Sequence, residues 1–203
     1  MGSTKISDLN SCRNTIYQSI NKLLSVWSKE STLAFNNDKT KVMILSTPQM
    51  SRVHHLDEYD PNIAVSGYKL GYIKSCKLLR VYINEHLKSD DHIKHTVSGC
   101  YATLSIRRKL QYLAKYELRK QLAETLLLSK LDFADLVFYS LPYFLLRPLH
   151  RVQFAAARFV LCRNVKNFRD VLKIGWLPIN GRRDLNLLKL CFKALHNTKT
   201  RLS

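Results

Sequence analysis

Apolar residues recur at helical spacing close to the start of the chain. Ile16, Ile20, Leu23 and Trp27 follow the period of 3.6 residues that marks one face of an amphipathic helix. This spacing predicts a helix over about residues 9–29. Beyond it the pattern changes, because the next apolar residues stand in short runs that are separated by polar, glycine-containing or proline-containing segments.

The short apolar runs predict strands. Residues 41–46 read as a buried strand, and residues 63–65 and 68–73 flank Gly67 as a small hairpin. Residues 76–84 read as one further strand. Polar residues and two prolines over 48–62 predict a loop. The first 88 residues therefore predict a helix combined with small antiparallel strands.

From residue 90 onward the pattern predicts helices alone. Asp90 or Asp91 is a candidate N-cap for a helix that continues to about Ala114. Three further helices follow from the apolar spacing, over residues 117–130, 147–161 and 184–196. The expected fold class is α+β with two parts. Residues 1–88 form a small antiparallel part with one helix, and residues 89–203 form an all-α bundle.

Composition narrows the class of protein. With 203 residues and 46% hydrophobic residues, the chain has enough apolar side chains to bury a core, which excludes a disordered basic tail. The most apolar stretch, residues 136–146, is too short to span a bilayer and contains Pro142, so we expect no membrane partner. Five scattered cysteines favour a reducing, intracellular compartment, with nucleus and cytoplasm both open.

The charge is strongly positive and unevenly distributed. The formal net charge is +18, from 33 Lys and Arg against 15 Asp and Glu. Residues 1–89 hold 12 basic and 7 acidic side chains, whereas residues 90–203 hold 21 and 8, which gives a net charge of +13 to the second part. No acidic residue stands between Asp135 and Asp170. A polyanion is therefore the first candidate partner.

Three arginines of the second part fall in one row. At about 100° per residue, Arg151 lies about 40° and Arg158 about 20° from Arg147, opposite the apolar face of the same predicted helix. Such a row suits a phosphate backbone, although a solvated helix face is the alternative. A second cluster, Arg107–Lys109, has the same two interpretations, since cations are also favoured at the C-terminus of a helix.

Several segments stand together in an order that is typical of one family. The order is a helix with Trp27, an Asn-x-x-Lys-Thr segment, a hairpin, a Lys-x-Leu-x-Val-x-Ile-x-x-x-Leu segment, His-Ile, Val-Gln-x-x-Ala-x-Arg and Trp-Leu-Pro-Ile. The chain resembles in these respects the reverse transcriptases of non-LTR (LINE-type) retrotransposons, above all the jockey-like group. The resemblance covers about residues 10–196. The matching residues are Trp27, Asn36, Asp38, Lys39, Thr40, Lys41, Gly67, Lys77, Leu79, Val81, Ile83, Leu87, His92, Ile93, Leu131, Val152, Gln153, Ala156, Ala157, Arg158, Trp176, Leu177, Pro178, Ile179 and Arg182.

The resemblance implies the end of a polymerase palm, a primer-gripping hairpin and a helical thumb. The family's Tyr-x-Asp-Asp hairpin, which with a third aspartate binds Mg²⁺, would fall before Met1, so the fingers and the rest of the palm would be a missing N-terminal partner. We therefore expect no cofactor in this chain, with Mg²⁺ expected only for the complete polymerase. In an intact enzyme, Lys39 is the candidate proton donor to the leaving pyrophosphate, and a solvated lysine is the alternative.

The segment from Lys77 to Ile83 matches the primer grip, where the family usually has Leu-Gly and this sequence has Leu79-Arg80. Arg80 adds a side chain where glycine lets another backbone come close, and it is instead a candidate phosphate contact. The expected nucleic-acid-binding residues are Lys77, Arg80, Arg107, Arg108, Lys109, Arg147, Arg151 and Arg158.

The adjacent Asp90 and Asp91 are not a catalytic pair, because a helical pattern follows them where a metal-binding hairpin would need two apolar strands. No Cys or His spacing indicates a metal site. The expected function is binding of an RNA/DNA template–primer in an RNA-directed DNA polymerase, catalytically incomplete in this chain. The alternatives are a stand-alone basic RNA-binding or interaction protein derived from a retroelement, and an inactive pseudogene product.

Overall fold

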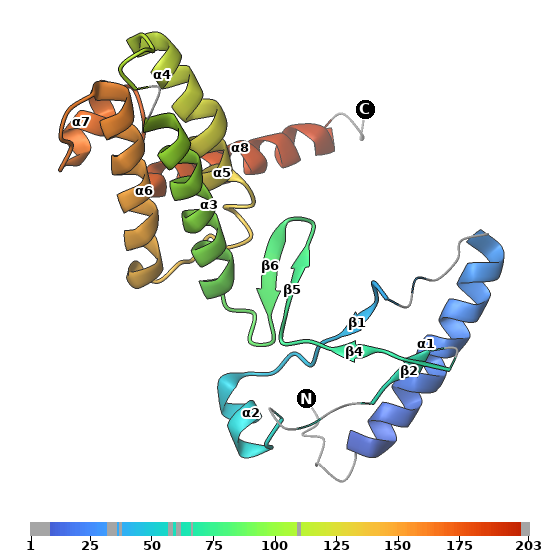
Figure 1. Cartoon of the computed structure of the whole chain (residues 1–203). Helices are drawn as coiled ribbons and strands as arrows, with labels where there is room; N and C mark the ends of the chain where they lie inside the picture. The colour runs from blue at the N-terminus through green and yellow to red at the C-terminus, as the bar shows by residue number, and fades with distance from the viewer. Residues whose placement is uncertain are drawn as a thin grey trace. The chain divides into compact units, whose positions relative to one another are not determined.

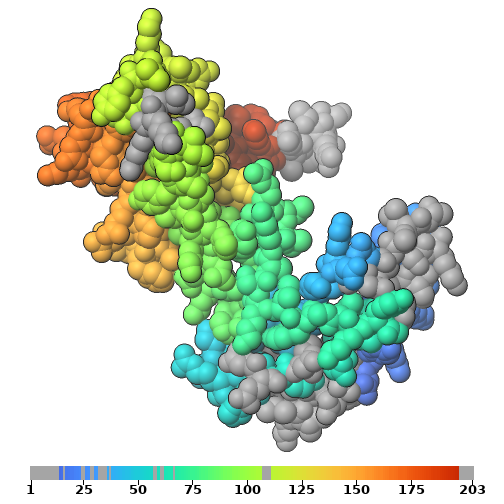
Figure 2. All heavy atoms as spheres, viewed as in Figure 1, coloured from blue at the N-terminus to red at the C-terminus, as the bar shows by residue number. Residues whose placement is uncertain are grey.

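The computed structural model describes residues 9–31, 36, 38–56, 59, 62–65, 67–108 and 111–199 (Figure 1; all heavy atoms in Figure 2). The chain divides between Lys88 and Ser89 into two compact units. We call residues 1–88 the N-terminal unit and residues 89–203 the C-terminal unit. Strands are found in the first of these units and most of the helical residues in the second, which agrees with a mixed α+β chain.

The N-terminal unit is built from one long helix, one short helix and three pairs of short strands. Helix α1 (Leu9–Ser31) confirms the first predicted helix. Strands β2 (Ala64–Val65) and β3 (Tyr68–Lys69) pair antiparallel around Gly67, as the sequence predicts. The buried hydrophobic side chains described for this unit are Ile63, Val65 and Leu70, which pack against Ile20 and Val42.

Two predictions for the N-terminal unit are wrong. The predicted strand over residues 41–46 is shorter, since β1 covers Lys41–Val42 and pairs in parallel with β4 (Gly71–Tyr72), so the sheets are not all antiparallel. The segment predicted as a loop contains helix α2 (Pro48–Val53). The Thr47 hydroxyl caps this helix by accepting from the backbone N–H of Met50 at 3.2 Å, and proline is well suited to the first helical position.

The third wrong prediction concerns residues 76–84, which form a hairpin and not one strand. Strands β5 (Ser75–Leu78) and β6 (Val81–Asn84) pair antiparallel, with Leu78 opposite Val81. The two residues between them, Leu79 and Arg80, have φ angles of 47° and 70°. A two-residue turn that needs positive φ at both positions favours Asn-Gly or Gly-Gly, so Leu-Arg gave no sequence signal for it.

The regular elements described in the C-terminal unit are all helices. Its elements are α3 (Asp90–Arg108), α4 (Tyr116–Ala123), the π-helical segment η2 (Glu124–Leu128), α5 (Ser129–Asp132), α6 (Tyr143–Leu161), α7 (Phe168–Lys173) and α8 (Ile179–Lys199). Helices α4, η2 and α5 follow one another without a break and confirm the helix predicted over residues 117–130. No helix within the described ranges is long and apolar enough to cross a membrane.

Three helix boundaries in the C-terminal unit differ from their predicted positions. Helix α3 ends at Arg108 and not near Ala114, and α8 begins at Ile179, five positions before the predicted start. Helix α6 begins at Tyr143 and continues through Pro148, although proline cannot donate to the helical ladder. The buried residues that follow Pro148, from Leu149 onward, pack in the core and stabilise the helix in spite of the proline.

The adjacent aspartates lie in the first turn of α3 and not at the N-cap position before it. The backbone N–H of Ile93 donates to the carbonyl of Ser89 at 2.9 Å, which makes Ser89 the residue before the helix. Asp90 and Asp91 still interact favourably with the N-terminus of the helix, where negative charge is stabilised. Neither stands in a strand–turn–strand hairpin.

One continuous hydrophobic core holds the C-terminal unit together. It extends from Ile93 in α3 to Ile179 at the start of α8, and α6 packs against α3, α4, α7 and α8. In Figure 1, α3, α4 and α6 lie side by side. Helix α6 is therefore the central helix of this unit, and its surroundings determine which of its side chains reach solvent.

Candidate nucleic-acid interface

The solvent-facing side of α6 consists of arginines. From Leu145 to the end of the helix, the exposed residues of α6 are Arg147, Arg151 and Arg158. Every other residue of this stretch is buried or half-buried. The three guanidinium groups thus belong to one narrow strip that extends over about 16 Å of helix axis. We call these three residues the arginine row.

The strip is narrow because neighbouring helices cover α6 on its other sides. Ala155, Ala156 and Ala157 are all buried, although they point about 100° apart from one another around the axis. Alanine side chains let a neighbouring helix approach closely on each of these sides. Val152 and Val160 are fully buried on the face opposite the row. The helix with this amphipathic sequence is therefore packed on all sides except the one that carries the arginine row.

Several acidic side chains of the C-terminal unit pair with residues outside the arginine row. Asp132 pairs with Arg182, and Asp170 pairs with Arg163 at 2.6 Å. The Glu124 carboxylate accepts from the Trp176 indole N–H at 2.7 Å.

Asp184 accepts from the Tyr139 hydroxyl at 2.6 Å. Within the part of the chain that the structure describes, no ion pair of Arg147, Arg151 or Arg158 is found. Three cations in one row give this side of the helix a positive potential.

Aromatic side chains border the arginine row. Phe154 lies on the same side of α6, between Arg151 and Arg158, and its ring packs on Phe168 of α7 at 4.9 Å between centroids. Phe168 also meets the His150 ring edge-on at 5.2 Å, and 38% of Phe168 is exposed. Basic and partly exposed aromatic side chains side by side are typical of surfaces that bind nucleic acids, where bases stack on rings beside phosphate contacts.

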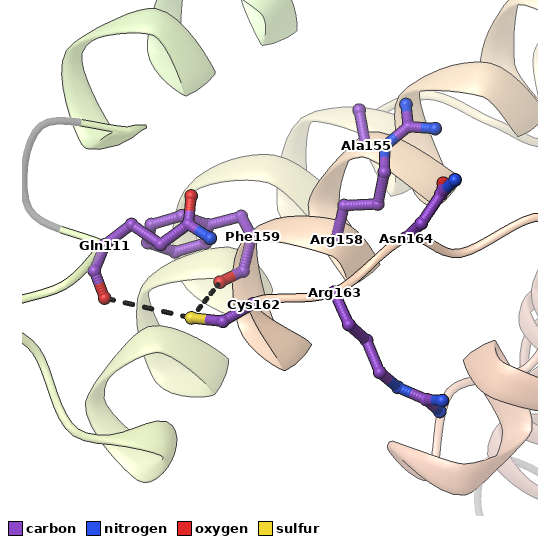
Figure 3. Close-up of a pocket in the computed structure, with 7 residues that line it drawn as sticks. All are labelled: Gln111, Ala155, Arg158, Phe159, Cys162, Arg163 and Asn164. Atoms are coloured by element: carbon purple, nitrogen blue, oxygen red, sulfur yellow. Dashed lines mark hydrogen bonds between the residues drawn. The ribbon is translucent and has the colours of Figure 1, made fainter.

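A shallow depression lies at the C-terminal end of the arginine row. It has a volume of about 350 Å³ and is lined by Gln111, Ala155, Arg158, Phe159, Cys162, Arg163 and Asn164 (Figure 3). Cys162 ends α6 in the left-handed conformation at φ 52°. Its Sγ lies 3.9 Å from the carbonyl oxygens of Gln111 and Phe159. The Arg163 guanidinium pairs with Asp170. Arg158 is therefore the lining arginine that remains available to bind an anion in this depression.

The second predicted basic cluster is only partly described. Arg107 and Arg108 form the last residues of α3, and their side chains, like all of Lys109, lie outside the described residues. Nearby Arg119 has a structural role that the sequence did not reveal. Its guanidinium donates to the carbonyls of Val160 at 3.0 Å and Gln111 at 3.3 Å, which ties α4 to the end of α6.

The predicted residues of the N-terminal unit lie on exposed turns and strands. Lys77 in β5 is exposed, with its Nζ 5.6 Å from the centroid of the Tyr82 ring on β6. Arg80 is exposed in the hairpin turn. Lys39 is also exposed, and its backbone N–H donates to the Asn36 Oδ1 at 3.0 Å. Lys77 and Arg80 thus share one hairpin, separate in sequence and in unit from the arginine row.

Buried titratable groups in the C-terminal unit are part of its packing. Burial lowers the pKa of His92, which stacks on Phe138 at 4.8 Å, and the nearby His95 lowers it further. Burial lowers the pKa of Arg183, and the Asp135 carboxylate acts in the opposite direction. Burial raises the pKa of Cys100 to about 11. Because desolvation is the largest cause in each case, these shifts do not mark an acid–base pair.

The described residues contain no group of three or more His, Cys, Asp or Glu that could hold a metal ion. Asp90 and Asp91 belong to no such group. Comparison of the chain with protein-family models, with curated proteins and with solved structures gave no match.

Proposed function

We propose that the C-terminal unit binds the sugar–phosphate backbone of a nucleic acid through Arg147, Arg151 and Arg158. The observation that carries this proposal is that, beyond its first turn, the central helix has these three arginines as its exposed residues, while its other residues are buried or half-buried. Guanidinium groups bind phosphate oxygens in a bidentate manner, and backbone contacts of this kind do not depend on base sequence. Binding is therefore expected to weaken steeply as salt is raised.

We further propose that the chain is the template–primer-binding part of an RNA-directed DNA polymerase of the non-LTR retrotransposon kind. The resemblance of its ordered sequence motifs supports this. A second support is the backbone at Arg80, where the related enzymes usually have glycine. Its φ of 70° lies in the left-handed region that favours glycine. In this proposal the N-terminal unit is the end of the palm with the primer-grip hairpin β5–β6, and the C-terminal unit is the thumb.

The continuous core of the C-terminal unit favours a second candidate function, a stand-alone basic RNA-binding module. The two candidates differ in what they recognise. A polymerase fragment should prefer an RNA template with a recessed DNA primer end, whereas a stand-alone module should bind single-stranded RNA equally well. Lys77 and Arg80 matter for the first candidate alone, because they would contact the primer.

Fluorescence anisotropy with the full chain tests the proposed function. The probe is a labelled RNA template annealed to a shorter DNA primer, at about 50 mM salt, where about three phosphate contacts contribute strongly. The triple variant Arg147→Gln/Arg151→Gln/Arg158→Gln should bind at least about tenfold more weakly than the unaltered chain. The matched control is Arg52→Gln/Lys88→Gln/Lys94→Gln, which removes the same charge from exposed positions elsewhere.

The control variant should weaken binding by less than about threefold. Equal losses in the two triple variants would mean that net charge and not the arginine row governs binding. Template-directed nucleotide incorporation by this chain alone would contradict its description as a catalytically incomplete fragment.

A further inference from the structure

The C-terminal half of α8 extends beyond the core of its own unit. Its first turn is anchored, since Ile179 and Arg183 are buried. From Leu188 to His196, by contrast, every residue is exposed. Figure 1 shows this half of the helix projecting past the other helices of the C-terminal unit. A helical segment of this length whose side chains are all exposed is marginal in water, so a binding partner that covers it would stabilise it.

The exposed half nevertheless carries a regular apolar stripe. Leu185, Leu188, Phe192 and Leu195 follow the three-four spacing of a coiled-coil seam and fall within an arc of about 80°. Leu188, Phe192 and Leu195 are 66%, 62% and 67% exposed. The sequence spacing predicts Leu185, Leu188 and Phe192 on one face of the last helix, and the structure leaves this face in solvent. Large apolar residues gathered on one exposed face mark an interaction surface.

The charge beside the stripe indicates the chemistry of the partner. Lys189 and Lys193 lie on one flank, about 40° and 80° beyond Leu185 around the axis. No acidic residue follows Asp184 in the sequence. A partner that covers the leucines must therefore meet a positively charged flank, and acidic side chains beside its own apolar seam would satisfy this requirement.

We propose that this face of α8 binds an acidic amphipathic helix of a partner protein. The partner helix would pack its leucine-type seam on Leu185, Leu188, Phe192 and Leu195 and place Asp or Glu next to Lys189 and Lys193. A second copy of the chain fits less well, because it would bring another +18 molecule and more lysines to the same place. This interaction is independent of the arginine row, which lies on a different helix.

A designed peptide of three heptads tests the proposal with the full chain. The peptide has Leu at positions a and d and Glu at e and g, and it carries a fluorophore for anisotropy. A scrambled peptide of the same composition, with its leucines spread around the helix, controls for attraction by charge alone. The unaltered chain should bind the patterned peptide at least about tenfold more tightly than the scrambled one.

Leu188→Gln/Phe192→Gln should weaken binding of the patterned peptide by at least about tenfold, because it removes the centre of the apolar stripe. Leu190→Gln is the matched control, since Leu190 is 53% exposed on the opposite side of α8. It should change the affinity by less than about twofold. All three positions are exposed, and far-UV circular dichroism checks that the helix content of both variants is unchanged.

Three results would overturn the proposal. The first is equal affinity for the patterned and scrambled peptides, which would indicate attraction by charge alone. The second is an equal loss of affinity in the Leu190→Gln control. The third is a dimer in sedimentation velocity that dissociates on Leu188→Gln/Phe192→Gln, which would show a second copy as the occupant. Nucleic-acid binding should be unaffected by either variant, so this test and that of the proposed function fail separately.

Discussion

The two units of the chain differ in how much of their apolar surface they bury. The C-terminal unit encloses a continuous core from Ile93 to Ile179, whereas the described core of the N-terminal unit is the small cluster of Ile63, Val65 and Leu70. The N-terminal unit also divides its strands into separate two-stranded pairs. Isolated pairs of this kind are marginally stable in water unless further strands or helices cover them.

Because the C-terminal unit has the larger core, a binding surface on its helices is held more rigidly than one on the N-terminal unit. Arg147, Arg151 and Arg158 stand on a helix that is fixed by packing on most of its circumference, so their positions are set before any ligand arrives. Lys77 and Arg80 stand on a hairpin whose strand residues are all exposed or half-buried. Fewer packing contacts therefore hold these two side chains in place before a ligand binds. We expect the first set to contribute more to affinity than the second.

The largest expected effect is on the core of the C-terminal unit. Leu127→Ala removes a fully buried side chain of η2 and should lower the free energy of unfolding of this unit by about 3 kcal/mol. Leu70→Ala, the same change in the N-terminal unit, should cost under about 2 kcal/mol, because the small cluster around it can collapse. Hydrogen exchange of the amides in each unit measures both values, and a larger loss for Leu70→Ala would reverse the comparison.

The next effect concerns the guanidinium group that is buried in the C-terminal unit. Arg183 donates to the backbone carbonyls of Asp135 at 2.9 Å and Tyr139 at 3.4 Å, and to that of Phe138. Arg183→Met should lower the free energy of unfolding by about 2 kcal/mol, since these acceptors lose their donor. The neighbouring Arg182→Met breaks a partly exposed pair with Asp132 and should cost under about 1 kcal/mol. Urea unfolding followed by circular dichroism compares the two variants.

The C-terminal unit should also become less stable as the pH is lowered. Burial lowers the pKa values of His92 and His150 below 6.5, so the unfolded chain binds protons that the folded unit does not. The free energy of unfolding should therefore decrease as pH falls below about 6.5, by at most about 1.4 kcal/mol per pH unit for each histidine. Unfolding of His92→Gln between pH 7 and pH 5 should show a smaller slope than that of the unaltered chain.

The smallest expected effect is a gain in the N-terminal unit. Arg80 adopts a φ of 70°, so Arg80→Gly should stabilise the β5–β6 hairpin by about 1 kcal/mol relative to Arg80→Ala. Alanine is the matched control, because it removes the same side chain but keeps the unfavourable Cβ. Amide exchange of Val81–Asn84 reports the difference. Equal protection in the two variants would show that the turn is not strained.

Some elements could be predicted because a single physical signal determines them. The periodic apolar residues of α1 and of the helix from Tyr116 to Asp132 gave the correct elements. The Leu79-Arg80 turn could not be predicted, because its positive φ angles contradict the preferences of both residues. Helix α2 depends on a single threonine cap and a proline, which also fit a loop.

In the candidate site, too, some features follow from a local sequence signal and others do not. Regular spacing identified the arginine row, since helical periodicity places its members on one face. The use of Arg119 as a backbone clamp depends on carbonyls of Gln111 and Val160 that are distant in sequence, so no local pattern reveals it. The exposure of the α8 stripe was also not predictable, because an apolar face looks the same whether or not the unit covers it.

The salt dependence of nucleic-acid binding is the most direct test of whether the arginine row contacts phosphates. Affinity of the full chain for the RNA/DNA template–primer is measured from 50 to 300 mM salt, and log K is plotted against log salt concentration for the unaltered chain and for Arg147→Gln/Arg151→Gln/Arg158→Gln. If the arginine row contacts three phosphates, the triple substitution should reduce the magnitude of the slope by about 2 to 3. An unchanged slope would contradict the account, because the row would then contact no phosphate.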